Sequence, residues 1–407
     1  MAQDDLVERL RQAVKKPAKA FVKDWVLWRE LPAIYREASS APIDARKIIF
    51  IEDKSLEMPD AFSVIFPYLQ DNFDLDVSFV GLGKTSGKGW RSYYAACREL
   101  VREVATARAV FLADASDIIS CLPLREGTDV VQLWHACGAF KKWGMGTAEL
   151  KFGGSRSEIT RHPGYGNLSL VTVSSSEVEW AYREAMALED VPETVRALGV
   201  SRTDTFFDPA FLAEARRAVE ELMPAARGKR IVLYAPTFRG HVHDAMGPDA
   251  LDIPLMRHIL GDDHVLLVKH HPFVKKPPTI PGQCRDFAFD VGDRLATPVL
   301  LAVADALVTD YSSVAFEYSL FNRPMAFFAY DLDDYNDWRG FFYDYDEMTP
   351  GPVVTQTVEL AGWLRDVADG GFDDAEVAAF RERFMRACDG HATERIVGKL
   401  GLSKSTR

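Results

Sequence analysis

Four short polar clusters in this chain each follow a run of apolar residues, and each contains side chains suited to phosphate or proton chemistry. The clusters are His135 with Gly138, Lys141 and Lys142; Thr237 with Arg239; Lys269 with His271; and Asp310 with Ser312 and Ser313. Arginine binds phosphate through parallel N–H groups, and histidine exchanges protons near neutral pH. Together the clusters predict a cationic, hydroxyl-lined site for a diphosphate inside a chain whose net charge is −12.

The cluster at Asp310 lies in a stretch that predicts a strand, a turn, a helix, a second turn and a second strand. Residues 307–309 are an apolar strand, 314–321 an amphipathic helix, and 325–330 the next apolar strand. Exposed N–H groups and the helix dipole favour phosphate at such a helix start. The alternative is ordinary N-capping by Ser or Asp, and this stretch alone does not separate the two interpretations.

The histidine cluster also has two interpretations. His135 ends the apolar run 130–134. A histidine at a strand end is more often structural than catalytic, but the Gly and Lys residues that follow favour a role as proton acceptor. The cluster therefore makes His135 a candidate proton acceptor.

The elements that must position these clusters alternate between strand and helix along the whole chain. The expected strands are 47–52, 76–80, 109–113, 130–134, 170–173, 231–235, 265–269, 306–309 and 325–330. Such alternation predicts an α/β fold with parallel sheets that carry helices on both faces. We expect a helical segment 1–40, doubly wound domains at 41–215 and 216–385, and a C-terminal tail 386–407. Ligands of such domains bind at the carboxyl ends of strands, which predicts a site in a cleft between them.

Composition excludes several classes of protein. The net charge of −12 argues against nucleic acid as the main partner, and no apolar run reaches the ~18 residues of a membrane span. The five scattered cysteines predict reduced thiols in a cytosolic protein, and no signal peptide is recognised. His241 and His243 lack further ligands at metal spacing, and Asp331 and Asp333 are expected in a solvated loop, so no metal is predicted.

The first 40 residues depart from the acidic average. They contain eight Lys and Arg residues against six Asp and Glu residues, and Phe21, Trp25 and Trp28 lie among them. Basic residues with interfacial aromatics can dock on an anionic membrane surface. The alternative is a helix that packs on the body of the protein.

These clusters, in this order, resemble the CDP-glycerol glycerophosphotransferase family of teichoic-acid synthesis over roughly residues 47–390. The matching motifs are Leu133-Trp-His135 followed by Lys141-Lys142; Gly199-Val-Ser-Arg202-Thr-Asp204; Tyr234-Ala-Pro-Thr237-Phe-Arg239; His271-Pro-Phe273; Thr309-Asp-Tyr-Ser-Ser313; Asn322-Arg-Pro324; Tyr330-Asp-Leu-Asp-Asp-Tyr335; Arg339-Gly-Phe341; and Pro350-Gly-Pro352. One motif differs from the family pattern. Many members have Trp-His-Gly-Thr-Pro where this chain has Trp134-His135-Ala136-Cys137-Gly138.

The resemblance implies a GT-B architecture and transfer of glycerol phosphate from CDP-glycerol to a lipid-linked glycerol-phosphate or saccharide acceptor, with no cofactor. It also implies a peripheral enzyme on the cytoplasmic face of the membrane. The implied donor side comprises Thr237, Arg239, Lys269, Asp310, Ser312, Ser313 and Arg339, with His135 and His271 catalytic. The implied acceptor side comprises Gly138, Lys141 and Lys142.

Four other functions fit the same sequence features in part. A ribitol-phosphate transferase or a nucleotide-sugar glycosyltransferase would use the same scaffold with another donor. A soluble epimerase-like GT-B enzyme would leave the basic, aromatic N-terminus without a use. A membrane-associated scaffold with a lapsed site is opposed by the intact His135, Arg239 and His271.

Overall fold

The computed structural model describes residues 20–87, 89–151, 153–240 and 245–402. Residues 1–19, together with His241 and His243, lie outside the described residues. The chain divides into two compact units. Residues 1–135, 160–171 and 399–407 form the first, and residues 136–159 and 172–398 form the second. This division follows contacts and does not test the expected domain boundaries, which stay predictions.

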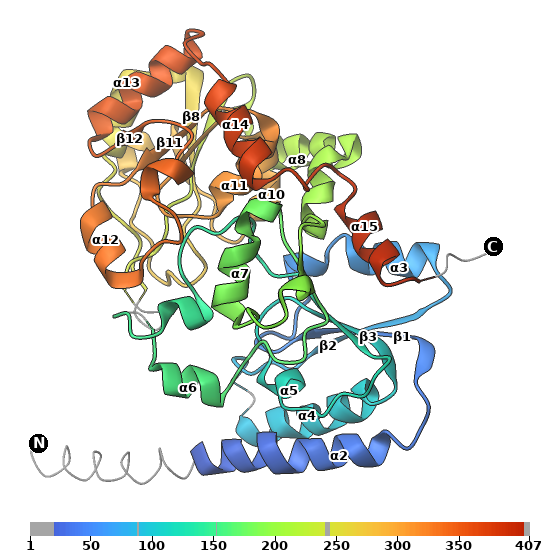
Figure 1. Cartoon of the computed structure of the whole chain (residues 1–407). Helices are drawn as coiled ribbons and strands as arrows, with labels where there is room; N and C mark the ends of the chain where they lie inside the picture. The colour runs from blue at the N-terminus through green and yellow to red at the C-terminus, as the bar shows by residue number, and fades with distance from the viewer. Residues whose placement is uncertain (1–19, 88, 152, 241–244, 403–407) are drawn as a thin grey trace, which may run out of the picture. The chain divides into compact units, whose positions relative to one another are not determined.

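The first sheet has the strand order β2-β1-β3-β4-β5-β6, and Figure 1 labels its strands β1, β2 and β3. The pairings of β1 with β2 and β3, of β3 with β4, and of β4 with β5 are all parallel. The order β2-β1-β3 places a topological switch between β1 and β3, as in flavodoxin-like folds. The strands are β1 (Asp44–Glu52), β2 (Asp76–Gly81), β3 (Ala107–Leu112), β4 (Asp129–Gln132), β5 (Leu170–Thr172) and β6 (Val195–Arg196), of which β6 and the end of β5 belong to the second unit.

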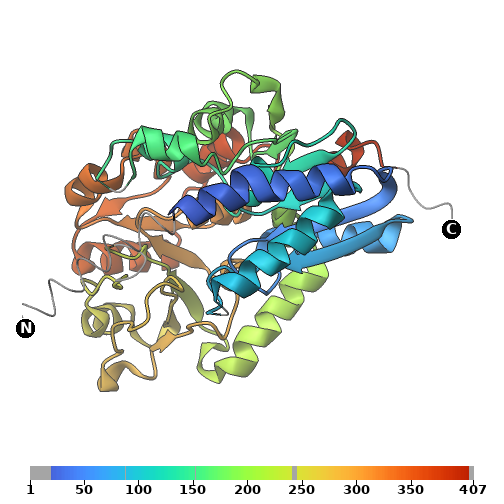
Figure 2. The same ribbon diagram turned by 90° about the horizontal axis from the view of Figure 1, so that it is seen from below.

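Helices of the first unit cover this sheet because their apolar faces need burial. Residues 20–25 are helical and continue through a π-helical turn, η1 (Val26–Glu30), into α2 (Leu31–Ala38). Figure 2 shows this helix beside α4 (Trp90–Val104), and Arg98 of α4 donates to the carboxylate of Glu30 at 2.7 Å. The remaining helices are α3 (Ile65–Asn72), α5 (Asp117–Ser120) and α6 (Arg156–Arg161), the last of which spans both units.

The second sheet is parallel throughout, with the strand order β12-β11-β10-β7-β8-β9. The chain starts at β7, adds β8 and β9 on one side, and then adds β10 to β12 on the other, which is the classic doubly wound order. The switch point therefore lies between β7 and β10. The strands are β7 (Arg230–Tyr234), β8 (His264–Val268), β9 (Ala288–Asp290), β10 (Ala306–Thr309), β11 (Met325–Phe328) and β12 (Val353–Val354).

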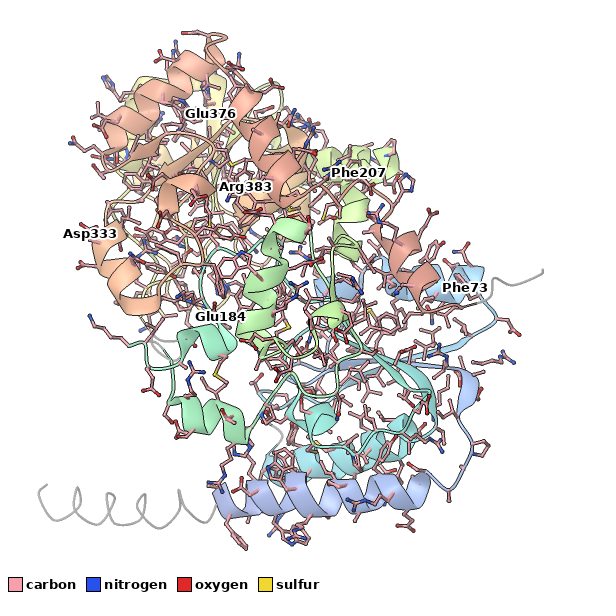
Figure 3. All side chains as sticks on the ribbon, in the orientation of Figure 1. Phe73, Glu184, Phe207, Asp333, Glu376 and Arg383 are labelled. Atoms are coloured by element: carbon pink, nitrogen blue, oxygen red, sulfur yellow. The ribbon has the colours of Figure 1, made fainter. Side chains whose placement is uncertain are left out.

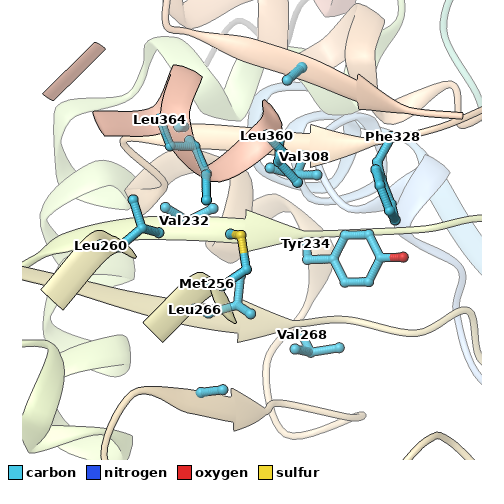
Figure 4. Packing of buried hydrophobic residues seen from close by; sticks show 14 of the residues in the cluster. Val232, Tyr234, Met256, Leu260, Leu266, Val268, Val308, Phe328, Leu360 and Leu364 are labelled. Atoms are coloured by element: carbon cyan, nitrogen blue, oxygen red, sulfur yellow. The ribbon is translucent and has the colours of Figure 1, made fainter. Parts of the chain in front are cut away.

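One face of this sheet packs on helices through an apolar cluster. Figure 4 shows Val232, Leu266 and Val308 of the strands beside Met256 and Leu360 of the helices, all buried. Buried apolar residues on adjacent strands are typical of a parallel sheet covered on its faces. The α-helices of this unit are α7 (Glu179–Met186), α8 (Pro209–Leu222), α9 (Ile253–Leu260), α10 (Thr297–Val303), α11 (Val314–Tyr318), α12 (Leu332–Arg339), α13 (Thr357–Ala368), α14 (Ala375–Phe384) and α15 (Ala392–Lys399).

The two doubly wound parallel sheets confirm the predicted α/β fold class, and all nine expected strands exist with ends shifted by three residues or fewer. The prediction missed β6, β9 and β12, which have only two or three residues and so carry no periodic pattern. The expected segment 375–400 is two helices, because Gly390 adopts φ +90° between them. A facing arrangement of the two domains stays a prediction.

Within the described ranges, no helix combines the length and apolar character that a membrane crossing requires.

Candidate active site

Three of the four predicted clusters lie at the carboxyl edge of the second sheet. Thr237 and Arg239 follow β7, and Asp310 to Ser313 follow β10, so the two clusters flank the switch point. Lys269 and His271 follow β8, the other neighbour of β7. Tyr234, Val268 and Phe328 lie near the ends of their strands at this edge (Figure 4). Ligands of doubly wound sheets bind at such a switch point because the two loops there diverge.

Asp310 joins the two loops that leave the switch point. Its carboxylate is almost completely buried, and Oδ1 accepts the backbone N–H groups of Thr237 at 2.8 Å and Tyr311 at 2.6 Å. Its other oxygen, Oδ2, accepts from Arg239 Nη1 at 3.0 Å. One carboxylate therefore fixes the loop after β7 against the loop after β10, which gives Asp310 a structural role whether or not it approaches a phosphate.

Arg239 is held by a second carboxylate as well. Its Nε and Nη2 donate to both oxygens of Asp331 at 2.6 and 2.9 Å, and Nη1 donates to the Thr237 carbonyl at 2.7 Å. Tyr311 donates its hydroxyl to Asp331 Oδ1 at 2.9 Å and lies with its ring 5.1 Å from the guanidinium. Two carboxylates thus offset the charge of Arg239, and its contact with phosphate stays a prediction.

Asp331 corrects one expectation from the sequence. A solvated loop was expected at Asp331 and Asp333, but Asp331 is a partner of Arg239 and of the Tyr311 hydroxyl. Asp333 does lie exposed on the first turn of α12, as Figure 3 shows. The Tyr330-Asp-Leu-Asp-Asp-Tyr335 motif indicated a conspicuous run of aspartates, but it did not predict which of them pairs with Arg239.

The cluster after β8 contains Lys269 and His271, whose side chains have different hydrogen-bond partners. Lys269 Nζ donates to the carbonyls of Gly292 and Leu295, and burial lowers the pKa of its ammonium group. His271 Nδ1 accepts the Phe273 N–H at 3.2 Å, and its ring contacts the Phe238 ring. Because Nδ1 accepts, a neutral His271 carries its proton on Nε2, where it can donate to a phosphate oxygen.

Three hydroxyls lie on the two switch-point loops. Ser312 Oγ accepts the Val314 N–H at 3.4 Å, and Ser313 precedes α11 without a side-chain cap. Thr237 Oγ1 is buried and has no hydrogen-bond partner among the described residues. Because buried hydroxyls are almost always hydrogen-bonded, this atom favours a bound group or water at the switch point.

The residues expected on the acceptor side contact the donor-side segment. Lys142 N–H donates to the Gly340 carbonyl at 3.1 Å, and Lys141 forms an antiparallel bridge with Phe341. Arg339 Nε donates to the Lys142 carbonyl at 3.4 Å, so this arginine ends α12 beside the same strip. Both segments belong to the second unit.

The close packing around residue 138 leaves room only for a glycine. Its φ is +63°, and a Cβ atom there would lie 2.4 Å from the ring of Phe316 in α11. Its N–H donates to Ser174 Oγ at 3.1 Å, and its carbonyl accepts from the Tyr182 hydroxyl at 3.0 Å. This contact explains the glycine without an acceptor, and the role expected for it stays a prediction.

His135 belongs to the first unit and is presented by a strained turn after β4. Trp134 has φ +59°, which is rare for a bulky residue, and its N–H donates to Gln132 Oε1 at 3.0 Å. The ring of the exposed His135 lies tilted against the Trp134 ring, and its Nδ1 lies 3.3 Å from the Ala113 carbonyl. A donating Nδ1 leaves Nε2 as the nitrogen that can take a proton, as a general base requires.

Known proteins with matching sequences and folds point to the same family as the motifs. The family model described as CDP-Glycerol:Poly(glycerophosphate) glycerophosphotransferase matches residues 33–401. The chain belongs to this glycerophosphotransferase family. This membership confirms the resemblance seen in the motifs.

Two relatives from Bacillus spizizenii illustrate the range of the family. The chain is 35% identical to a teichoic acid poly(ribitol-phosphate) polymerase over 88% of its own length and 56% of the relative's length. It is 30% identical to a teichoic acid ribitol-phosphate primase over 87% of its own length and 90% of the relative's. The chain therefore spans little more than half of the first relative and most of the second.

The solved structure of the wall teichoic acid polymerase TagF shares the fold. It matches 97% of both chains with a TM-score of 0.72 at 22% identity. This likeness supports the GT-B fold class for the glycerophosphotransferase chain.

One buried carboxylate of the chain was missed by the sequence analysis. Asp53 follows β1 at the switch point of the first sheet, is buried, and accepts from Ser116 Oγ at 3.3 Å. Burial raises the pKa of Asp53 to about 7, although Ser116 and Lys84 oppose that rise. A single acidic residue after a strand carries no sequence signal, so only burial identifies it. Among the described residues, no group of three or more His, Cys, Asp or Glu side chains could hold a metal.

Proposed function

We propose that this protein transfers glycerol phosphate from CDP-glycerol to a hydroxyl group of a membrane-linked teichoic-acid-type acceptor and releases CMP. The family match supports the donor and the reaction class. In the structure, the proposal rests on the switch point of the second sheet. Thr237, Asp310 and Ser312 lie there, at the carboxyl ends of β7 and β10. No cofactor is part of the proposal, and CDP-glycerol enters as a substrate.

The reaction has a simple balance of bonds and protons. The acceptor oxygen bonds to the phosphorus that carries glycerol, the bond from that phosphorus to the CMP oxygen breaks, and CMP leaves with the electron pair. His135 Nε2 takes the hydroxyl proton. His271, through Nε2–H, and the hydroxyls of Thr237 and Ser313 stabilise the charge that develops on the phosphate oxygens.

Ribitol phosphate is a second candidate for the transferred group. Both curated relatives named above act on ribitol phosphate by name. The two donors share the cytidine diphosphate and differ only in the length of the alditol. The candidates therefore share the nucleotide site and differ at the residues that receive the polyol.

We also propose that the protein works at the inner face of the cell membrane. The helix that contains residues 20–38 buries Val26 and Leu31 but leaves the rings of Phe21, Trp25 and Trp28 exposed. One face of this helix packs on the first unit, and the other presents aromatic rings of the kind that docks at a membrane surface, which supports the proposal. An anionic surface would attract its exposed basic residues, and a lipid-linked acceptor would be found there.

A donor panel tests the reaction. Purified protein is incubated with a lipid-linked acceptor and CDP-glycerol, CDP-ribitol, UDP-glucose or UDP-N-acetylglucosamine, and released nucleotide is measured. CMP release from CDP-glycerol supports the proposal, and greater release from CDP-ribitol selects the second candidate. Release of UDP alone would identify a sugar transferase, and no release from any donor would favour a lapsed site.

A further inference from the structure

We propose that Lys141 is the cation that contacts the diphosphate of the donor, and that it serves the donor side of the site. The inference rests on the proposed function, since it assumes a nucleoside diphosphate donor at the switch point of the second sheet. It differs from the expectation that Lys141 serves the acceptor.

Two other cations at this edge, Arg239 and Lys269, are already engaged. Arg239 is held by both oxygens of Asp331 and by Asp310. Lys269 Nζ is held by two backbone carbonyls. A phosphate would have to displace these partners before either cation could bind it. Lys141, by contrast, forms no ion pair with any carboxylate in the part of the chain that the structure describes.

A short ladder holds the backbone at Lys141 against the segment 340–342. On either side of its bridge to Phe341, Phe342 N–H donates to the Phe140 carbonyl and Lys142 N–H donates to the Gly340 carbonyl, each at 3.1 Å. The residues around Lys141 are therefore fixed by backbone hydrogen bonds, which do not depend on the side chain of Lys141.

Aromatic packing connects this ladder to the loop after β10. The ring of Phe140 lies 5.9 Å from that of Tyr345, whose hydroxyl donates to the Asp310 carbonyl at 3.0 Å. Phe341 lies 5.8 Å from the ring of Tyr311, the residue after Asp310. The half-buried Lys141 is thus anchored next to the loop that carries Ser312.

The charges around Lys141 favour an anion. Burial and the guanidinium of Arg339 lower the pKa of Lys141 to about 7, and Arg239 acts in the same direction. Asp310 is the carboxylate that opposes this shift. The charged form is therefore disfavoured until a negative group arrives. A diphosphate would supply two negative charges and raise the pKa of Lys141 on binding.

The pH dependence follows from this shift. Below pH ~7 Lys141 already carries its charge, so this group adds no dependence of donor affinity on pH. Above pH ~7 the free protein loses the proton and must take it up again when the donor binds. Donor affinity should then fall by up to about tenfold per pH unit, until the pH reaches the pKa of the bound state.

Calorimetric titration of the full chain with CDP-glycerol and CDP-ribitol between pH 6 and 9 tests the inference. We expect Lys141→Met to weaken donor binding at pH 7 by about 10- to 100-fold, the range for a charged hydrogen bond. Lys141→Arg keeps a permanent charge, so it should retain binding and remove the pH dependence above pH 7. Lys229→Met, at the amino end of β7, is the control and should bind like the wild type.

The outcomes separate this inference from the proposed function. If the wild type binds neither donor at any pH, the proposed function fails. If the wild type binds but Lys141→Met binds equally well, or Lys141→Arg keeps the same pH profile, Lys141 is not the donor cation. Thermal unfolding of each variant excludes loss of fold as the cause, and Lys141→Arg remains informative if Lys141→Met unfolds.

Discussion

At the scale of single residues, the site depends on carboxylates as much as on cations. Asp310 accepts N–H groups from two loops and also pairs with Arg239, while Asp331 holds the same guanidinium through both of its oxygens. A diphosphate site was predicted from cations and hydroxyls alone. The structure shows that part of the cationic charge is paired within the protein, because a buried guanidinium needs partners before any ligand binds.

Replacement of the proposed base should separate turnover from binding. We expect His135→Ala to lower the rate of CMP release on the order of 10²–10⁴-fold, because no group would take the hydroxyl proton, and to leave CDP-glycerol affinity within about twofold. Steady-state rates and calorimetric titration measure the two effects. His258→Ala, an exposed histidine on α9, is the control. Normal turnover in His135→Ala would reject the assignment of the base.

Asp53 predicts how stability depends on pH. Its pKa is raised by burial to about 7 in the folded protein, from the 3.8 of an ordinary aspartate side chain. The folded state therefore holds a proton that the unfolded state has lost between pH ~4 and ~7, so this group's contribution to stability falls across that window and is constant above it. Asp53→Asn cannot ionise and should be more stable than the wild type at pH 8 by up to a few kcal/mol.

Chemical denaturation at pH 5 and pH 8 measures this effect. The difference in unfolding free energy between Asp53→Asn and wild type should grow with pH. An equal difference at both pH values would mean that Asp53 is ionised in the folded protein. Glu57→Gln, which changes an exposed acidic residue nearby in sequence, is the control.

At the scale of elements, the segment after His135 is defined by its contact with α11. Gly138 lies against the Phe316 ring, and the buried thiol of Cys137 interacts with the buried thiol of Cys388. Cys137 and Gly138 belong to the motif where this chain departs from the usual Trp-His-Gly-Thr-Pro. The departure is therefore a packing feature of the second unit, and it does not by itself identify an acceptor.

A pair of glycine substitutions tests this packing. Both Gly138 and Gly228 have positive φ, but a Cβ at Gly228 would meet nothing within 4 Å. Gly228→Ala should therefore cost only the backbone strain, about 1–2 kcal/mol. Gly138→Ala adds the overlap with Phe316 and should cost about 1–3 kcal/mol more. Denaturant unfolding gives both values, and equal losses would show that Phe316 moves away freely.

At the scale of the whole molecule, the chain is acidic yet presents aromatic rings on its first described helix. Phe21, Trp25 and Trp28 are 71%, 51% and 40% exposed, whereas Val26 and Leu27 of the same helix are buried. Exposed aromatics on one side of a helix are typical of a surface that meets the headgroup region of a bilayer.

Vesicle binding tests this membrane role. We expect the triple variant Phe21→Ser, Trp25→Ser, Trp28→Ser to bind vesicles with anionic headgroups on the order of tenfold less well than wild type, because it loses buried apolar area. Co-sedimentation with anionic and neutral vesicles measures the change. Trp180→Ser, which removes an exposed tryptophan of α7, is the control. Unchanged binding by the triple variant would reject the membrane surface.

The sequence alone was sufficient for the fold class and for the position of the clusters along the chain. Apolar runs such as 306–309 and 231–235 are local signals, because a buried parallel strand is continuously apolar. Polar residues directly after such runs must lie at the carboxyl edge of a parallel sheet. Thr237, Lys269 and Asp310 were placed there correctly for this reason.

Only the tertiary structure decided which side chains neutralise one another. The pairing of Arg239 with Asp331, the contact of Lys141 with the segment at Phe341 and the buried state of Asp53 join residues far apart in the chain. Burial and partner charge set the pKa of a group, and both arise only when distant segments pack together. A sequence shows which ionisable groups are present, but their charges depend on the folded neighbours.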